Sequence, residues 1–282
     1  MAQCAGFCYG VKRAVETTKK VKIENASKKV WVLGELIHNS HVIKELEELG
    51  IVTVDELPES ESGICIVRSH GMAPQKIKEI TDKGFEVVDL TCLDVKKVQQ
   101  KAVQLAQENF LVLILGKPEH PEVIAIKANA EMFSEEVFVV PDMASLEKLT
   151  NEIKTAKKIG VVIQTTQKLE LLQSVVNYLI PLASELKVFN TICKSTAKRQ
   201  QEAKELAKTS DLMIVVGGKN SANTTHLAEI LNEITKTIHI ETDEDLSEYE
   251  AIIQNSKNIG VTAGASTPEN IIKSVLDKLN KI

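Results

Sequence analysis

The sequence contains the same unit three times, and this internal repeat constrains the fold more than any other feature. Three segments begin with cysteine and continue in a helical pattern: CYGVKRAVETTKKV from Cys8, CLDVKKVQQKAVQLAQ from Cys92 and CKSTAKRQQEAKELAK from Cys193. After 26, 24 and 24 residues, an apolar, strand-like run ends in glycine, at Gly34, Gly116 and Gly217. A repeat of this kind predicts similar supersecondary units that pack against one another.

Polar side chains follow the strand-like runs at equivalent places in the three units. Four residues after each glycine stand His38, His120 and Ser221. A later strand-like run in each unit ends near His70, near Gln164 and Thr165, or near Ser266. Strands that alternate with helices predict parallel sheets covered by helices. Because ligands of such sheets bind at the carboxyl ends of the strands, we expect these side chains to face a ligand.

We therefore predict an α/β fold of three similar α/β modules with mainly parallel sheets, arranged pseudo-threefold around a common centre. The predicted modules span residues 10–92, 93–189 and 190–282, and we expect residues 1–9 to pack against the third module. A length of 282 residues suits two or three modest domains. The joints between the repeats carry no linker rich in proline and glycine, so we expect the modules to pack together.

Composition excludes several classes of function. The net charge of −5 gives no basic field that would attract nucleic acid or an anionic membrane. The first residues lack an apolar core long enough for a signal peptide, and the longest apolar run, FLVLIL at 110–115, has the length of a strand. We therefore expect a cytoplasmic protein. Its five cysteines, an odd and sparse set, argue against a disulfide framework.

Cys8, Cys92 and Cys193 are expected to act as a set. On three similar modules they can converge on one axis, each at a helix N-terminus, where the helix dipole favours the thiolate. Three converging thiolates repel one another unless a metal ion or an iron–sulfur cluster compensates their charge. Structural zinc usually takes four ligands, often from close Cys-x-x-Cys pairs, which the sequence lacks. Three thiolates can instead hold three irons of a 4Fe–4S cluster and leave the fourth open to substrate.

Other cysteines and histidines have simpler interpretations. Cysteines are often small buried hydrophobic residues, and we retain that interpretation for Cys4 and Cys65, which lie outside the repeat pattern. Cys65 lies within the strand-like run ICIVRS and is expected in the core. Three histidines do not occupy repeat-equivalent places and are expected on the surface or in the core: His41, His226 and His239.

The remaining polar residues form a donor-rich set that suits a phosphate or diphosphate. Its members are His38, His70, His120, Ser221, Asn223 and Ser266. The runs GGKNSANTTHLAEI and AGASTPENIIK are typical of anion-binding loops that enter helices, although ordinary capping by serine and asparagine explains each run equally well. Glu122 follows Pro121, so a glutamate of the first helical turn is the simpler interpretation, and a proton relay is the alternative.

Eight motifs occur in an order that resembles the 4-hydroxy-3-methylbut-2-enyl diphosphate reductase family, also called IspH or LytB. They are GFCYGVKRAV, VRSHG, TCLDV, HPEV, QTT, TICKSTAKRQ, GGKNSANTTHLAEI and GVTAGAST. The resemblance covers nearly the whole chain, from Cys8 to about Ser266. Each motif alone is weak, but the ordered set is highly specific.

The resemblance implies a 4Fe–4S enzyme that closes the non-mevalonate isoprenoid pathway. Such an enzyme reductively removes the allylic hydroxyl of its diphosphate substrate and yields isopentenyl and dimethylallyl diphosphates with water. The resemblance also implies three α/β modules around a central cluster. A small flavin or iron–sulfur protein, such as flavodoxin or ferredoxin, would donate electrons, and the sequence shows no glycine fingerprint for NAD(P)H.

The resemblance also assigns a role to each matching residue. The cluster ligands would be Cys8, Cys92 and Cys193. Glu122 would deliver protons, Thr165 would be its partner near the substrate hydroxyl, and Thr196 would help to position water. The diphosphate would be bound by His38, His70, His120, Ser221, Asn223 and Ser266.

The chain departs from the family pattern at a few positions, none of which removes a proposed ligand or acid. Leu93 stands where proline usually follows the second cysteine, Ala222 replaces the second serine of a Ser-Ser-Asn run, and Asn190 replaces a frequent aspartate. Lys117 and the run VIAIKANA also differ from the usual residues around HPEV.

Two other functions stay open on the residues alone. A non-catalytic iron–sulfur redox or iron sensor would need the cysteines but neither Glu122 nor the diphosphate set. A zinc-dependent hydrolase would use cysteine and histidine ligands.

Overall fold

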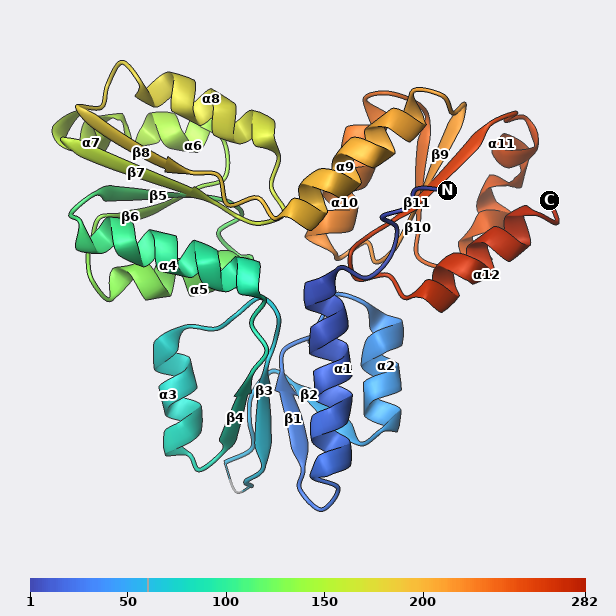
Figure 1. Cartoon of the computed structure of the whole chain (residues 1–282), viewed down its shortest axis with the longest axis horizontal. Coiled ribbons are helices and arrows are strands. Elements are labelled where there is room, and N and C mark those ends of the chain that lie inside the picture. Colours follow the sequence, from blue (N-terminus) through green and yellow to red (C-terminus); the bar gives the residue numbers. More distant parts are fainter. Residues whose placement is uncertain (60) are drawn as a thin grey trace. The chain divides into compact units, whose positions relative to one another are not determined.

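The structure, a computed structural model, describes residues 1–59 and 61–282 as strands alternating with helices (Figure 1). By the density of their contacts, the residues form two compact units. Unit 1 comprises Met1–Lys20, Glu35–Ile51 and Lys194–Ile282, and unit 2 comprises Val21–Gly34 and Val52–Cys193. The predicted boundaries at residues 10–92, 93–189 and 190–282 stay a prediction. Within the described ranges, no helix is long and apolar enough to cross a membrane.

Unit 2 contains most of one sheet and all of a second. The first has the strand order β2-β1-β3-β4, in which β1, β3 and β4 run parallel. Its strands are β1 (Val30–Leu33), β2 (Ile51–Val54), β3 (Ile64–Val67) and β4 (Glu86–Asp89), and α3 (Pro74–Asp82) joins β3 to β4. The second sheet has the parallel order β6-β5-β7-β8. Its strands are β5 (Leu111–Leu115), β6 (Val137–Val140), β7 (Lys158–Ile163) and β8 (Glu185–Phe189).

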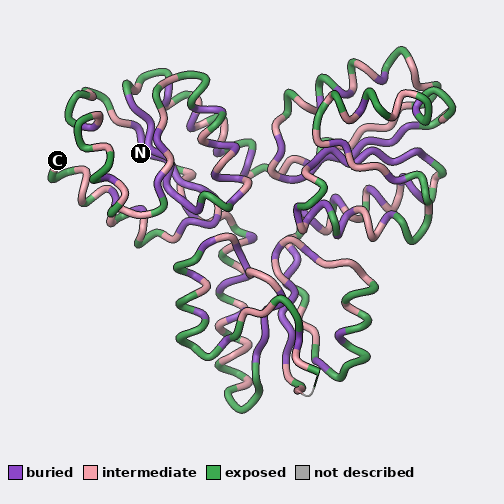
Figure 2. The backbone as a smooth tube through the Cα atoms, turned by 180° about the vertical axis from the view of Figure 1, so that it is seen from behind, coloured by how far each residue is buried: buried purple, intermediate pink, exposed green. Residues whose placement is uncertain are grey.

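Helices cover both faces of the second sheet (Figure 1). One face carries α4 (Leu93–Gln107) and α5 (Pro121–Glu131). The other carries α6 (Met143–Lys148), α7 (Thr150–Thr155) and α8 (Leu169–Leu179). The central strands β5 and β7 therefore have apolar residues on both sides, as expected of a parallel sheet buried on both faces. Figure 2 shows the buried residues concentrated in the strands and on the inner faces of the helices.

Unit 1 contains the third sheet, with the parallel order β10-β9-β11. Its strands are β9 (Leu212–Val216), β10 (Thr237–Ile240) and β11 (Ile259–Ala263). The helices that follow Cys193 are α9 (Lys194–Ala207), α10 (Ala222–Asn232), the 3-10 helix η1 (Glu244–Tyr249), α11 (Glu250–Gln254) and α12 (Glu269–Leu279). Near the N-terminus, α2 (Ser40–Glu48) belongs to unit 1, and α1 (Tyr9–Glu24) passes from unit 1 into unit 2.

The first residues of the chain lie along the outer strand of the third sheet. Ala2 N donates to Val261 O of β11 at 2.9 Å (Figure 1). This segment takes the place that β4 and β8 occupy beside the third strands of their sheets. The expectation that residues 1–9 pack against the third repeat agrees with this contact.

Sheet topology confirms the threefold repeat and the α/β fold class. In each sheet the first strand of the repeat is flanked by the second and the third. The glycine after each first strand donates its N–H to the end of the second strand, as in Gly34 to Val54 O (2.8 Å), Gly116 to Val140 O (3.2 Å) and Gly217 to Ile240 O (2.8 Å). The spacing of the repeat therefore reflects one backbone arrangement built three times.

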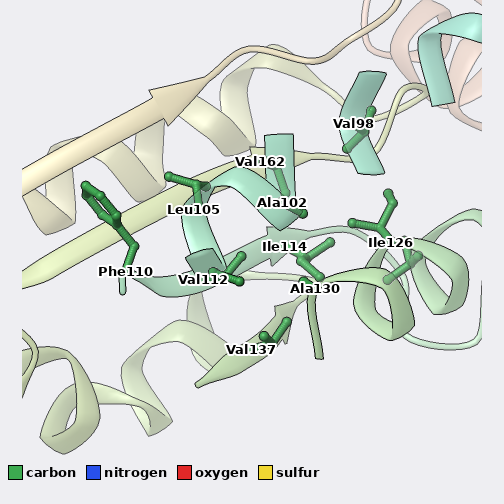
Figure 3. Close-up of a cluster of buried hydrophobic side chains, with 12 residues drawn as sticks. Val98, Ala102, Leu105, Phe110, Val112, Ile114, Ile126, Ala130, Val137 and Val162 are labelled. Atoms are coloured by element: carbon green, nitrogen blue, oxygen red, sulfur yellow. The ribbon is translucent and has the colours of Figure 1, made fainter. Parts of the chain in front are cut away.

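The core of the second sheet is densely packed where α4 crosses it (Figure 3). Val98, Ala102 and Leu105 project from α4 onto Val112 and Val162 of the sheet. All five are fully buried, which matches the helical spacing of apolar residues in this segment. The close approach of helix and sheet requires a glycine, because a Cβ added to Gly160 of β7 would lie 2.6 Å from Leu105 Cδ2.

Replacing Gly160 by alanine is expected to destabilise the protein by about 1–3 kcal/mol, because the added methyl group overpacks this core. Leu105→Ala alone leaves a cavity and should cost about 2–5 kcal/mol. The double variant should cost less than the two changes together, because the shortened side chain makes room for the methyl group. Equilibrium denaturation measures all three values. Strictly additive effects would contradict the packing described.

Candidate functional site

The three repeat cysteines occupy the same structural position. Each directly precedes a helix, and each cysteine N–H donates to a carbonyl two residues beyond the third strand of a sheet. These bonds join Cys8 to Ala265 O (3.1 Å), Cys92 to Ser69 O (2.9 Å) and Cys193 to Thr165 O (3.0 Å). The thiols therefore lie at the carboxyl ends of parallel strands, where the repeat predicted them.

The turn before Cys92 is built by a carboxylate. Asp89 Oδ1 accepts hydrogen bonds from Thr91 N (2.9 Å) and Thr91 Oγ1, and Asp89 Oδ2 lies 2.6 Å from Lys96 Nζ of α4. Burial raises the pKa of Asp89, but the bonds from Lys96 and Thr91 outweigh burial and leave its pKa below the ordinary value. Cys92 is the N-cap of α4 and forms no side-chain cap, so its sulfur is not engaged with the helix end.

The turn before Cys193 follows the same plan with neutral side chains. Asn190 Oδ1 accepts from Ile192 N at 3.2 Å. Thr191 Oγ1 donates to Ile163 O and accepts from Ile163 N at 3.0 Å, which ties the turn to the end of β7. Asp89 and Asn190 each stand three residues before a cysteine, so the replacement of aspartate by asparagine preserves the turn.

The thiols fall into two groups. All five cysteines are thiols rather than disulfides within the described chain. Cys65 is fully buried in β3, and burial raises its pKa to about 11, which confirms its assignment to the core. The other four, Cys4, Cys8, Cys92 and Cys193, are only partly buried, so the expectation that Cys4 is a buried hydrophobic residue is wrong. Thiols anchored at helix starts and not enclosed by core fit the ligands of a metal centre, and Cys65 does not.

The other predicted site residues are divided between the units. Unit 2 carries Cys92, Cys193, His70, His120, Glu122 and Thr165. Unit 1 carries Cys8, His38, Thr196, Ser221, Asn223 and Ser266.

In unit 2 two histidine rings lie together. The ring centroids of His70 and His120 are 5.4 Å apart, with the planes at 84°. His120 is the N-cap of α5, and its Nδ1 accepts a hydrogen bond from Glu122 N at 3.1 Å. An Nδ1 that accepts carries no proton, so the neutral His120 ring bears its proton on Nε2. That N–H is suited to donate to an anionic ligand.

Glu122 lies next to this pair and is 1% exposed. Its Oε1 accepts from Thr165 N at 2.7 Å, and its Oε2 lies 2.8 Å from Thr165 Oγ1. It belongs to the first turn of α5, as expected, but a glutamate placed there only for the helix dipole would not need burial. The contact with Thr165 is the pairing that the family resemblance implied.

Burial sets the protonation of this carboxyl group. Desolvation raises the pKa of Glu122 from 4.5 to about 7, and the charge of Asp94 acts in the same direction. The two bonds from Thr165 oppose this rise by stabilising the carboxylate. Glu122 can therefore both hold and release a proton near neutral pH.

In unit 1 a set of hydroxyl groups lies after the strands of the third sheet. Ser221, the N-cap of α10, forms no side-chain cap, and its Oγ lies 3.5 Å from Ser266 Oγ. Ser266 Oγ also donates to His38 O at 3.2 Å. Both serines are buried. Asn223 is buried too, and its Nδ2 has no hydrogen-bond partner within residues 1–59 and 61–282. Thr196 lies buried in the first turn of α9.

Several residues of the site escaped prediction from the sequence. His38 Nδ1 lies 2.9 Å from a carboxylate oxygen of Glu35, which orients the ring. Asp89 was also missed as the residue that shapes the Cys92 turn. The repeat contained a signal for Asp89, because Asn190 stands at the equivalent place. The sequence contained no comparable signal for Glu35.

The chain matches the family model described as LytB protein over residues 1–280. It is 43% identical over 283 residues to the 4-hydroxy-3-methylbut-2-enyl diphosphate reductase of Pelobacter propionicus, covering 100% of this chain and 97% of that protein. It is 40% identical over 284 residues to the protein of the same name from Geobacter sulfurreducens, with coverages of 100% and 96%.

Two solved structures are similar over nearly the whole chain. One is (E)-4-hydroxy-3-methyl-but-2-enyl diphosphate reductase, the terminal enzyme of the non-mevalonate pathway, with a TM-score of 0.74, 38% identity, and coverages of 100% and 98%. The other is the E-1-hydroxy-2-methyl-but-2-enyl-4-diphosphate reductase of Plasmodium falciparum, with a TM-score of 0.87, 28% identity, and coverages of 97% and 85%.

The raised pKa of Glu122 predicts a pH-dependent stability. Its folded-state pKa of about 7 exceeds the ordinary value of 4.5, so folding takes up a proton between these values. This contribution to stability is complete below about pH 4.5 and is lost as pH rises through about 7. Glu122→Gln mimics the neutral form and does not titrate. Relative to wild type, the variant should gain about 3 kcal/mol between pH 4.5 and 8.

Chemical denaturation of both proteins across this range measures the effect, and titrations common to both cancel in the difference. A stability difference that does not vary with pH would contradict the burial of an ionisable Glu122.

Proposed function

The chain belongs to the LytB protein family, and on this premise we propose that it acts as a 4-hydroxy-3-methylbut-2-enyl diphosphate reductase. In this reaction the allylic C–O bond breaks, two electrons and two protons are taken up, and water leaves. The organic product is isopentenyl diphosphate or dimethylallyl diphosphate. The observation that carries the proposal is the buried carboxyl of Glu122, whose pKa of about 7 suits a proton donor beside the histidine pair.

The family implies an iron–sulfur cluster, and the donor set of this chain fits one. We assign Cys8, Cys92 and Cys193 as ligands of a single 4Fe–4S cluster with one iron open to substrate. Support comes from their shared anchoring through the main-chain N–H and their partial exposure. Helix N-termini favour the thiolate form that ligation requires. When bound, the cluster supplies the two electrons, which it receives from a donor protein such as flavodoxin or ferredoxin, and a Lewis-acidic iron.

We assign the diphosphate to six donor side chains. These are His38, His70, His120, Ser221, Asn223 and Ser266. Three observations support the assignment. His120 presents an Nε2–H because its Nδ1 accepts a hydrogen bond. Ser221 starts a helix without capping it, so its hydroxyl is available at a positive helix end. Asn223 carries a buried Nδ2 that has no partner among the described residues, and an unsatisfied buried donor calls for a ligand.

Glu122 is assigned as the proton donor. Its Oε1 accepts the main-chain N–H of Thr165, so the proton of the neutral acid resides on Oε2, beside Thr165 Oγ1. Thr165 can pass this proton toward the leaving hydroxyl, and Thr196 is assigned to orient water. Burial keeps water away from the carboxyl, which preserves the proton until the substrate takes it.

The rival functions make less use of these features. A non-catalytic sensor has no need of a buried acid with a pKa near 7, and the relatives that match the full chain are named as reductases. A zinc hydrolase would contain zinc and no sulfide, which elemental analysis decides.

Cys193→Ser is expected to remove most of the cluster iron and all turnover, because a ligand is lost. The measurement is iron, sulfide and visible absorption of anaerobically purified protein, followed by turnover of the allylic diphosphate with a reduced dye. Cys65→Ala is the matched control, since that thiol lies in the core, and it should retain cluster and rate. Full iron and wild-type turnover in Cys193→Ser would refute the ligand assignment.

Glu122→Gln should retain substrate binding and lose about 10²–10⁴-fold in turnover, the usual contribution of a positioned acid. Wild-type turnover per cluster should fall as pH rises through about 7, because only the protonated acid donates. Glu119→Gln removes an exposed carboxylate three residues earlier and serves as the control. An unchanged rate in Glu122→Gln would remove this residue from the proton path.

A further inference from the structure

The segment that carries Cys8 is held by two side chains of opposite charge on α9. We propose that Arg199 and Glu202, here called the α9 clasp, are positioning residues that fix Cys8 for its role as a ligand. The inference rests on the proposed function, because it takes Cys8 as one of the cluster ligands. All residues of the clasp and of the held segment belong to unit 1.

Glu202 holds the start of the segment by its main-chain donors. One carboxylate oxygen accepts from Gln3 N, and the other accepts from Cys4 N at 2.8 Å. Burial raises the pKa of the Cys4 thiol, and a hydrogen bond to the Glu202 carboxylate raises it further. Cys4 is therefore a neutral thiol, and its hydrogen bond to Glu202 helps to hold the segment. It does not compete with Cys8 as a thiolate ligand of the cluster.

Arg199 ties the end of the segment to β11 through one carbonyl group of each. The residue as a whole is 4% exposed. Nη2 donates to Gly6 O at 2.8 Å, and Nη1 donates to Ala263 O at 2.7 Å. Gly6 stands two residues before Cys8, and Ala263 stands two residues before Ala265, whose carbonyl accepts the N–H of Cys8. The buried guanidinium thus connects the two backbone segments that define the position of Cys8, namely the N-terminal segment and the end of β11.

The other two cysteines do not need such a clasp. Three residues before them stand Asp89 and Asn190, whose side chains close the turn. The equivalent residue before Cys8 is Ala5, which has no group to do so. The first repeat cysteine therefore lacks the local device that shapes the other two turns, and the contacts of α9 replace it.

The position of Arg199 in its helix supports this interpretation. It stands six residues after Cys193, where the other repeats have Ala14 after Cys8 and Val98 after Cys92. Both of those residues are fully buried and apolar. A buried guanidinium is costly to desolvate unless its donors are paired. An arginine at this place is therefore favourable only because its hydrogen bonds offset that cost. The repeat with the arginine is the one whose helix contacts the N-terminal segment.

The test replaces Arg199 by glutamine in anaerobically purified full-length protein. Two local readouts are hydrogen exchange of the amides of residues 2–8 and the rate of iron loss to a chelator. Loss of two charge-assisted bonds should speed both by about tenfold or more. The electron paramagnetic resonance signal of the reduced cluster should also change shape, because one ligand is no longer held in place. Hydrogen exchange of the amides in β9 should be the same as in the wild-type protein.

Lys198→Gln is the matched control, because it removes one exposed positive charge from the same helix. It should behave as wild type in all three readouts. Glu202→Gln is the second variant, for use if Arg199→Gln does not fold. It keeps one acceptor oxygen, and it should speed hydrogen exchange of the amides of Gln3 and Cys4. Wild-type exchange of residues 2–8 in both clasp variants would overturn the inference. A wild-type protein that contains no iron would instead refute the proposed function. Hydrogen exchange of residues 2–8 would still show whether Arg199 and Glu202 hold this segment.

Discussion

The hydrogen bond from each cysteine N–H to the loop beyond a third strand is the constraint on which the rest of the structure depends. It joins Cys8, Cys92 and Cys193 to carbonyl groups at equivalent places in three sheets. Since the acceptor always lies beyond the carboxyl end of a parallel strand, the thiol reaches the edge where such sheets bind ligands. The helix that starts at each of these cysteines belongs to the next repeat, so each cysteine joins two repeats instead of belonging to one.

Because a cysteine stands directly before each of these helices, the helices lack the residues that cap a helix best. Serine or aspartate at the N-cap of α4 would stabilise the helix by about 1 kcal/mol more than a residue that forms no cap. The loss is offset by side chains just outside the helix, since Asp89 organises the turn before Cys92 and binds Lys96 within α4. Before Cys193, Asn190 and Thr191 organise the turn by their own hydrogen bonds. Bonds made by residues just outside the helix therefore take the place of a side-chain cap.

The sequence allowed prediction of the features that recur. Three apolar strands at nearly equal distances from three cysteines are a local pattern, and this pattern predicted the α/β repeat and the positions of the thiols. Burial of Glu122 was not predictable from such patterns, because its neighbour Thr165 stands 43 residues away in the chain. The role of Arg199 was hidden for the same reason, since its partners Gly6 and Ala263 are distant in sequence.

Thr165 connects Glu122 and Cys193 through one loop. Its main-chain N–H and hydroxyl hold the carboxyl of Glu122, and its carbonyl accepts the N–H of Cys193. The first two bonds also keep the pKa of Glu122 from rising as far as burial alone would drive it. Without these bonds the carboxyl group would release its proton only at a higher pH. A displacement of this single residue after β7 would therefore alter both the acidity of Glu122 and the position of the Cys193 thiol.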